Sequence, residues 1–404
     1  MKLRLTILLV LGFFVAGEAQ QKNPEHWVAT WATAEMLIRT PPPPAAAPAR
    51  GFHNQTVRMT ARVSIGGHRL RVKISNAFAS APLALGTAHI ALRSKDSEIV
   101  AGSDHALSFA GKSGCTIGPG IVTISDPVEM TVAPLADLSV SLYFAEETGP
   151  PTNHGTALHN TYIKDGDVTG AASMADGQKT QQYYWLAAID AVAPADAAAI
   201  VTYGDSITDG ARSDTETNHS WPALLAARLA TNKATADIGV ANLGIGGNRV
   251  LRDVAGTSAL ARFDRDVLSQ SGAKWVMFME GINDIGHGNT EPVTAGELIA
   301  AHKTIVEMAH AHGIKAIGCT LTPYEGAAYF REDGEAIRAA LNAWIRTGGV
   351  YDAVVDFDAA TRDAANPKHI RPEFDPGDHL HPNNAGYESM AKAVDLAIFS
   401  GKKK

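Results

Sequence analysis

Apolar and polar residues alternate with a period of two in several short stretches of the first half of the chain. Residues 56–65 (TVRMTARVSI) and 68–75 (HRLRVKIS) show this pattern, with Gly66-Gly67 between them, and residues 138–144 (LSVSLYF) repeat it. Alternation of this kind predicts strands with one buried face, and the glycine pair predicts a hairpin that joins the first two strands. Short strands separated by glycine and proline, without a long helical period, are typical of a β-sandwich.

The second half of the chain has a different pattern, in which short runs are apolar at almost every position. These runs cover residues 199–204, 236–244, 274–281, 314–323 and 351–358. Continuous apolar runs of this length predict strands that are buried on both faces, as in a parallel sheet. Stretches with a helical period separate the runs, for example Leu298, His302 and Ile305. The alternation of strands and helices therefore predicts an α/β fold, in which a parallel sheet carries helices on both faces and forms three layers.

The change of pattern sets the predicted domain boundaries. A jelly-roll-like β-sandwich domain is expected at residues 20–190, a linker at 191–198 and the α/β domain at 199–400. Residues 1–19 begin with basic residues, continue with an apolar stretch and end on small residues, which predicts a secretory signal peptide. No later segment is apolar enough to predict a membrane span. We therefore expect a protein that is exported to the periplasm or the extracellular space.

Composition and charge narrow the range of functions. Of the 404 residues, 45% are hydrophobic and 19% are charged, which is typical of a globular protein. The formal net charge of -7 argues against a nucleic-acid partner, because phosphate recognition needs a basic surface. The two cysteines, Cys115 and Cys319, lie far apart in different predicted domains, which gives little reason to expect a disulfide between them.

Polar residues that favour turns follow four of the five predicted parallel strands. Asp205-Ser206 follows the first strand, GIGGNR (244–249) the second, GIND (281–284) the third and DHLHP (378–382) the fifth. Because ligands bind at the carboxyl ends of the strands in open parallel sheets, we expect these four loops to converge at one edge of the sheet. Together they contain the groups that an acyl-transfer site needs.

The residue types in these loops fit nucleophilic catalysis. A serine becomes an effective nucleophile when a base accepts its proton, and His381 is the candidate base for Ser206. Asp378 lies three residues before His381, so one turn can bring its carboxylate to the imidazole and fix the tautomer of the ring. The backbone N–H groups of Ser206 and Gly247 and the side-chain amide of Asn283 are candidate donors to the oxyanion of a tetrahedral intermediate.

In chain order, the sequences GDSITDG, GIGGNR, GIND and DHLHP resemble the four blocks of the SGNH (GDSL-type) hydrolase superfamily. This resemblance covers residues 198–400 and implies an SGNH/flavodoxin-like α/β fold. Further stretches such as WPALLAARLA, TLTPYEGA and, upstream, WVATWATA resemble a secreted two-domain subgroup that includes acetylxylan esterases. The finer resemblance extends over nearly all of the chain after residue 19 and implies a role in deacetylating polysaccharides.

The superfamily resemblance also assigns a role to each candidate residue by its position. It implies Ser206 as the nucleophile and first oxyanion donor, Gly247 as the second donor, with Gly246 as the alternative, and Asn283 as the third. Asp378 and His381 complete the implied catalytic triad. The resemblance implies no cofactor.

We therefore expect a secreted serine esterase that hydrolyses short-chain (acetyl) esters through an acyl-enzyme on Ser206. The expected partner is an acetylated carbohydrate, such as xylan or a related plant polysaccharide or oligosaccharide, or another short-chain ester. A broad-specificity lipolytic esterase or lysophospholipase would use the same triad and is an alternative. An alternative of another class is a carbohydrate-binding protein whose hydrolase domain is vestigial.

Several of these residues also have purely structural interpretations. Ser206 would serve as a helix cap and Asn283 as the first residue of an Asx turn. Asp205 and Asp284 are expected to hold their turns by accepting hydrogen bonds from backbone amides, and His379 is expected to be a loop or core residue. The spacings His379-x-His381 and His310-x-His312 lack the third ligand of a zinc site, so no metal is expected.

Two histidines of the N-terminal domain, His154 and His159, and the tryptophans of WVATW (27–31) are candidates for contacts with a substrate. The alternative is that these side chains pack the sandwich or the contact between the two domains.

Overall fold

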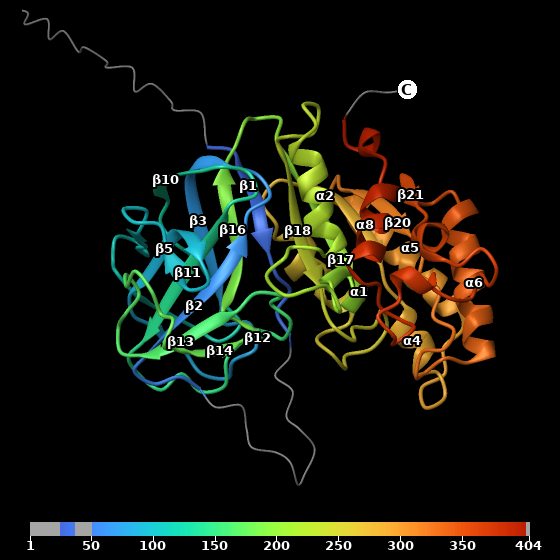
Figure 1. Cartoon of the computed structure of the whole chain (residues 1–404), viewed down its shortest axis with the longest axis horizontal. Coiled ribbons are helices and arrows are strands. Elements are labelled where there is room, and N and C mark those ends of the chain that lie inside the picture. Colours follow the sequence, from blue (N-terminus) through green and yellow to red (C-terminus); the bar gives the residue numbers. More distant parts are fainter. Residues whose placement is uncertain (1–24, 37–50, 401–404) are drawn as a thin grey trace, which may run out of the picture.

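The computed structural model describes residues 25–36 and 51–400, so the predicted signal peptide at residues 1–19 lies outside the described residues. Figure 1 shows two halves side by side, an N-terminal half made of strands and a C-terminal half in which helices surround a sheet. The first half ends with β16 (Leu186–Val192) and the second begins with β17 (Ala198–Gly204).

Two antiparallel sheets form most of the N-terminal half. The first has the order β1 (Trp27–Ala32), β16, β3 (Gly67–Ser75), β10 (Val128–Val132), and β9 (Val122–Ile124) also pairs with β3. The second has the order β14 (Gln178–Thr180), β13 (Thr161–Asp165), β2 (Gln55–Arg62), β11 (Asp137–Phe144), β5 (Ala88–Lys95), β6 (Glu98–Ile99), with β7 (His105–Ala106) on β5. Two small ribbons pair β4 (Leu83–Leu85) with β8 (Cys115–Ile117) and β12 (Asn153–His154) with β15 (Tyr183–Tyr184). The inward-facing side chains of both main sheets share one hydrophobic cluster.

The predicted hairpin across Gly66-Gly67 is wrong, because β2 and β3 belong to different sheets. A Cβ added at Gly66 would lie 2.3 Å from the carbonyl oxygen of Val132, so the chain passes too close to this backbone for any larger residue. The glycine therefore serves a close approach where the chain crosses from one sheet to the other. The alternating pattern itself is confirmed, since the apolar residues of β2 and β3 are buried in the same cluster.

A five-stranded parallel sheet forms the centre of the C-terminal half, as the apolar runs predicted. Its order is β18 (Ile238–Gly244), β17, β19 (Ala273–Met279), β20 (Lys315–Cys319), β21 (Ala353–Val355). Numbered from β17 onward this order is 2-1-3-4-5, which is the flavodoxin-like order. The direction of winding reverses between β17 and β19, and such a switch point places a site at the carboxyl ends of these strands.

The helices of this half pack in two groups. One group contains α2 (Trp221–Ala230), α7 (Phe357–Thr361) and α8 (Asn384–Ala393), and the other contains α3 (Ala259–Phe263), α5 (Ala295–Ala311) and α6 (Glu332–Thr347). Right-handed crossovers in opposite directions along a sheet place their helices on opposite faces, which accounts for the separation of α2 from α3, α5 and α6. The helices α7 and α8 follow the last strand and pack beside α2. The remaining short elements are α1 (Ser206–Asp209), η1 (Asp264–Leu268), α4 (Ile282–Gly286), η2 (Pro372–Phe374) and η3 (Leu396–Ile398).

The two halves are joined by apolar packing and by hydrogen bonds. Residues of β1 belong to the same hydrophobic cluster as the parallel sheet, and β1 packs against β18. The backbone N–H of Ala29 donates to the carbonyl of Ser271 at 2.8 Å, and the backbone N–H of Val240 donates to the Ser64 hydroxyl at 2.8 Å. The N-terminal half therefore shares a core with the C-terminal half.

The thiols of Cys115 and Cys319 are free, and Cys319 is buried in β20. Across residues 25–36 and 51–400, no helix has both the length and the apolar character needed to cross a bilayer.

Candidate active site

Ser206 lies at the start of α1, directly after the carboxyl end of β17. Asp205 caps the helix, because its carboxylate accepts a hydrogen bond from the backbone N–H of Ile207 at 2.9 Å. The helix lies against the end of β18, where a Cβ on Gly244 would be 2.2 Å from the backbone nitrogen of Asp209. Glycine at position 244 therefore allows the turn that carries Ser206 to pack on the neighbouring strand, and Ser206 itself is 8% exposed.

The last polar loop brings an imidazole and a carboxylate to this serine. His381 Nε2 lies 2.8 Å from Ser206 Oγ, and His381 Nδ1 lies 2.9 Å from Asp378 Oδ2. The other oxygen of Asp378 accepts the backbone N–H groups of Leu380 and His381 at 3.1 and 3.0 Å. Partial burial alone would raise the pKa of Asp378, but the hydrogen bonds from His381 outweigh it and lower the pKa to about 2. The three residues proposed from the sequence thus form one hydrogen-bonded chain.

His379, between these two residues, belongs to the loop. Its backbone has a φ of 58°, and its ring pairs with Asp375 while almost half of the side chain is exposed. His379 is therefore a loop residue, which is one of the two roles expected from the sequence. Nowhere within residues 25–36 and 51–400 do three or more His, Cys, Asp or Glu side chains gather in a way that could hold a metal ion.

The candidate oxyanion donors lie on the two adjacent loops. Asn283, on α4, is 4% exposed and donates from Nδ2 to the carbonyl of Asn248 at 2.9 Å, which leaves the second hydrogen of its amide. Its Oδ1 accepts the hydroxyl of Tyr329 at 3.3 Å. Gly247 has a φ of 75°, in the left-handed region that favours glycine. In the described part of the chain, the backbone N–H groups of Ser206 and Gly247 donate to no other protein group.

Arg262, on α3, connects the loops of this site, and sequence reasoning missed it. The fully buried guanidinium donates to the carbonyl of Gly204 at 2.9 Å, to the carbonyl of Leu243 at 2.8 Å and to Asn248 Oδ1 at 3.0 Å. Gly204 lies just before the turn that carries Ser206. Leu243 lies just before the loop of residues 244–249, and Asn248 lies within that loop. A single arginine among the apolar positions of a helix gives no sequence pattern that would have revealed this role.

Three buried acids lie around Ser206 and Arg262. Burial raises the pKa of Asp205 to about 7, and it raises the pKa of Glu280, whose carboxylate lies 3.6 Å from the Arg262 guanidinium. Asp284 accepts the backbone N–H groups of Val250 and Leu251 at 2.8 and 3.1 Å. The predicted roles of Asp205 and Asp284 in holding turns are therefore confirmed.

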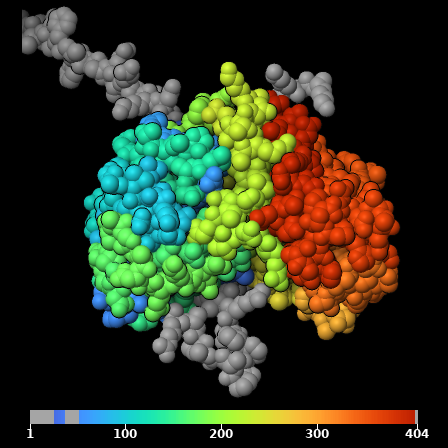
Figure 2. Space-filling view, in the orientation of Figure 1, coloured from blue at the N-terminus to red at the C-terminus, as the bar shows by residue number. Residues whose placement is uncertain are grey.

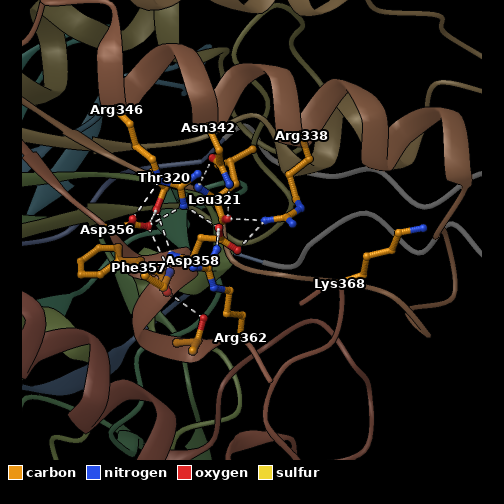
Figure 3. Close-up of polar contacts among 12 residues, drawn as sticks. Thr320, Leu321, Arg338, Asn342, Arg346, Asp356, Phe357, Asp358, Arg362 and Lys368 are labelled. Atoms are coloured by element: carbon orange, nitrogen blue, oxygen red, sulfur yellow. Dashed lines mark hydrogen bonds and ion pairs between the residues drawn. The ribbon is translucent and has the colours of Figure 1, made fainter. Parts of the chain in front are cut away.

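An ionic network holds α7, the helix that precedes the loop of Asp378 (Figure 3). Asp358 on α7 pairs with Arg338 at 3.0 Å and with Arg346 at 2.5 Å, and Asp356 pairs with Arg346 at 2.7 Å. The Thr320 hydroxyl donates to Asp356 at 2.9 Å, which ties α7 to the end of β20. These contacts hold α7 against the sheet and α6. This helix precedes the loop of residues 375–382, called the acid–base loop below because it carries Asp378 and His381.

The histidines that were candidates for substrate contacts pack between the two halves. The ring of His154 bridges the carbonyl of Ala34 at 2.6 Å and Asp209 Oδ1 at 3.1 Å, and it is buried. His159 is 5% exposed and contacts Glu216 and Asn218 of the C-terminal half. The alternative interpretation, packing at the contact between the domains, describes both residues.

The C-terminal half is thus an α/β domain with a hydrogen-bonded serine, histidine and aspartate at the carboxyl edge of its parallel sheet. Residues 202–388 match the sequence model of the GDSL-like Lipase/Acylhydrolase family. The predicted resemblance to the SGNH (GDSL-type) superfamily is therefore confirmed for this part of the chain. A search among curated proteins found no match.

Solved structures of similar domains cover about half of the chain. One is a putative lipolytic protein of the G-D-S-L family from Desulfitobacterium hafniense, with 25% identity, 48% of this chain and 96% of that chain covered, and a TM-score of 0.38. A variant of Axe2, an acetyl-xylooligosaccharide esterase from Geobacillus, has 25% identity, 51% and 95% coverage and a TM-score of 0.41. LAE5, a hydrolase from the metagenome of Lake Arreo, has 27% identity, 50% and 95% coverage and a TM-score of 0.36.

Proposed function

We propose that the chain is an exported serine esterase that removes acetyl groups from xylan or related plant polysaccharides or oligosaccharides. The observation that carries this proposal is the continuous contact from Ser206 Oγ through His381 to Asp378, with distances of 2.8 and 2.9 Å. Such a chain can activate a hydroxyl for attack on an ester carbonyl. The match of residues 202–388 to the GDSL-like Lipase/Acylhydrolase family supports the same class of reaction.

Acylation begins with proton transfer from Ser206 to His381 Nε2. The Asp378 carboxylate accepts the N–H at His381 Nδ1, which leaves Nε2 free to act as the base. Ser206 Oγ then attacks the carbonyl carbon of the acetyl ester. The same carboxylate stabilises the imidazolium that forms, because it stays ionised at neutral pH with a pKa of about 2.

The negative oxygen of the tetrahedral intermediate is bound by the backbone N–H groups of Ser206 and Gly247 and by the amide of Asn283. These donors are fixed before the reaction, so little reorganisation is needed when charge develops. The alcohol leaves with the proton from His381. Water, deprotonated by the same imidazole, then attacks the acyl-enzyme and releases acetate.

The sequence supports the substrate and the location of this reaction. The stretches that resemble the secreted two-domain acetylxylan-esterase-like subgroup lie in both halves of the chain, and residues 1–19 have the pattern of a signal peptide. We therefore propose a short-chain ester of a carbohydrate as the substrate, outside the cytoplasm, with the N-terminal half as the β-sandwich domain of such a protein.

Hydrolysis of p-nitrophenyl acetate by Ser206→Ala and by a control, Ser389→Ala, tests the nucleophile. Ser389 is a partly buried serine on α8 that bonds the carbonyl of Ala360 at 2.8 Å, so its loss should leave the rate near that of the parent. Ser206→Ala should retain its fold and lose the activity. Activity in folded Ser206→Ala would contradict the mechanism.

Two further measurements test the substrate. Acetate release from acetylated xylan, measured beside p-nitrophenyl esters from acetyl to dodecanoyl, should show a preference for acetyl. A preference for long chains would favour the lipolytic esterase or lysophospholipase. A protein that binds xylan but hydrolyses none of these esters would indicate a vestigial hydrolase domain.

A further inference from the structure

The loop of residues 211–219, which follows the helix of Ser206, lies between the two halves of the molecule. Figure 2 shows the yellow-green segment that follows β17 between the blue-to-green N-terminal half and the red C-terminal segment. Three residues of this 211–219 loop have a positive φ, although none of them is a glycine. They are Arg212 (72°), Glu216 (67°) and Asn218 (56°). This conformation is uncommon for residues with a side chain and persists where surrounding groups hold it.

The N-terminal half holds one end of the 211–219 loop. Glu216 Oε2 lies 2.6 Å from Arg93 Nη2 and 3.0 Å from His159 Nδ1, and Oε1 accepts the backbone N–H of Asn160 at 2.6 Å. His159 Nε2 lies 3.0 Å from Asn218 Oδ1, so both ring nitrogens contact the loop. Burial alone would raise the pKa of Glu216, but the hydrogen bonds from His159 and Asn160 lower it to about 2, so this carboxylate is charged at neutral pH.

The other end of the loop contacts the proposed triad. Arg212 Nε donates to Asp378 Oδ2 at 2.8 Å, and the same oxygen faces His381 Nδ1 at 2.9 Å. The backbone N–H of Asp214 donates to Asn384 Oδ1 at 2.9 Å, just beyond the acid–base loop. The loop therefore connects two N-terminal side chains, Arg93 and His159, to the carboxylate that faces the catalytic imidazole.

We propose that the N-terminal half tunes the protonation of His381 through this loop, with Arg212 as a positioning residue that acts on Asp378. The inference rests on the proposed function, because it takes His381 as the base. The permanent positive charge of the Arg212 guanidinium disfavours the protonated, cationic form of His381, whereas the negative charge of Asp378 favours that form. His159 and Glu216 keep the loop in the strained conformation that places Arg212 on this oxygen.

The expected size of the effect follows from distance and exposure. The guanidinium and the imidazole bond the same carboxylate oxygen, so the two cations lie within about 6 Å of each other. The Arg212 side chain is 60% exposed, so solvent and salt screen the repulsion. Loss of the arginine charge should therefore move the acidic limb of the pH–rate profile to higher pH by about 0.3–1 pH unit.

Other ionisable groups near His381 do not change in this experiment. They are Asp205 on the Ser206 turn, Asp375 and His379 on the acid–base loop, and the buried phenols Tyr329 and Tyr387, whose pKa values respond to burial first and also to the charges of Asp205 and Asp378. Because this set stays the same in each variant, a shift between variants reports Arg212.

The test is the dependence of kcat/KM on pH for p-nitrophenyl acetate. The acidic limb of this profile reports the pKa of the base in the free enzyme. Arg212→Gln should move the limb to higher pH by about 0.3–1 pH unit, and Arg212→Lys, which keeps the charge, should move it less. A limb that stays in place in Arg212→Gln would overturn the proposal.

Variants of the N-terminal half test the connection. His159→Ala should shift the limb in the same direction as Arg212→Gln, and the double variant should shift it no further, because both changes remove one interaction. His89→Ala is the matched control, since this histidine of the N-terminal half pairs with Asp104 at 2.7 Å, and it should leave the limb in place. If His159→Ala fails to fold, Asn218→Gly removes the contact between Asn218 and His159 Nε2 while tolerating the φ of 56°, and a shift in the same direction is expected.

The outcomes separate this inference from the proposed function. Additive shifts in the double variant, or no shift in either His159→Ala or Asn218→Gly, would overturn the connection to the N-terminal half. Hydrolysis that persists in Ser206→Ala would overturn the proposed function instead. If hydrolysis requires Ser206 but the acidic limb of the kcat/KM profile stays in place in Arg212→Gln, only the inference is overturned.

Discussion

Replacing Asn283 by alanine removes the one side-chain donor of the proposed oxyanion hole. The amide is buried, and one of its hydrogens already bonds the carbonyl of Asn248 at 2.9 Å, so the second is available to an oxyanion. Loss of one such donor typically costs about 2.7–4 kcal/mol of transition-state stabilisation, so kcat should fall by about 10²–10³-fold. KM should change little, because the interaction strengthens only as the oxyanion forms.

The same substitution should also lower stability by a smaller amount. The carbonyl of Asn248 loses its donor within a buried loop, which should reduce the free energy of unfolding by about 1–3 kcal/mol. Steady-state kinetics with p-nitrophenyl acetate and urea denaturation followed by circular dichroism measure the two effects separately. Asn366→Ala, which removes an exposed amide that bonds Glu325 at 3.0 Å, is the control and should change neither kcat nor stability appreciably.

A folded Asn283→Ala variant whose kcat stays within about threefold of the parent would contradict the role of Asn283 as an oxyanion donor. A higher KM with an unchanged kcat would also contradict it, because Asn283 would then bind the substrate rather than the transition state.

Three further predictions follow from the same contacts. Asp378→Asn should lower kcat by about 10⁴-fold with the fold intact, since the amide would no longer hold the ring in its tautomer, and near-parental kcat would exclude the aspartate from the triad. Arg262→Met should lower the free energy of unfolding by about 3–5 kcal/mol in urea, because Glu280 would be left buried without its cation, whereas the partly exposed control Arg371→Met should stay within about 0.5 kcal/mol. The pKa of Asp205 is raised to about 7 in the folded state against about 3.9 when unfolded, so its contribution to stability is present below about pH 4 and is lost as the pH rises to about 7. Asp205→Asn should therefore flatten the decline in the free energy of unfolding over this range, and an unchanged slope would refute the assignment.

Much of the C-terminal half could be predicted from the sequence, for a physical reason. A strand buried on both faces must be apolar at almost every position, so β17 to β21 stand out as continuous apolar runs. Ser206 and Asn283 lie just after β17 and β19, whereas the loop of Asp378 and His381 comes after α7 and η2 and directly before α8. The carboxyl edge of a parallel sheet brings such loops together. The positions of Ser206, Asn283 and His381 were therefore predictable, although their catalytic roles remain proposals.

The failures arose where tertiary contacts decide the structure. Alternation predicted the buried faces of β2 and β3 but not their partners, because the same pattern suits a hairpin and two strands in facing sheets. Gly66 suggested a turn, whereas the structure uses it for a close approach to the backbone of Val132. Arg262 and Arg212 act through contacts with residues distant in sequence, and a single arginine carries no periodic signal.

In the proposed mechanism, Ser206 is the nucleophile that forms the acyl-enzyme. Labelling with a fluorophosphonate, followed by mass spectrometry of the peptides, tests it most directly. We expect one adduct per chain, located on Ser206, that forms in step with the loss of esterase activity and forms much more slowly in His381→Ala. An adduct on another residue, or full activity after Ser206 is completely labelled, would contradict it.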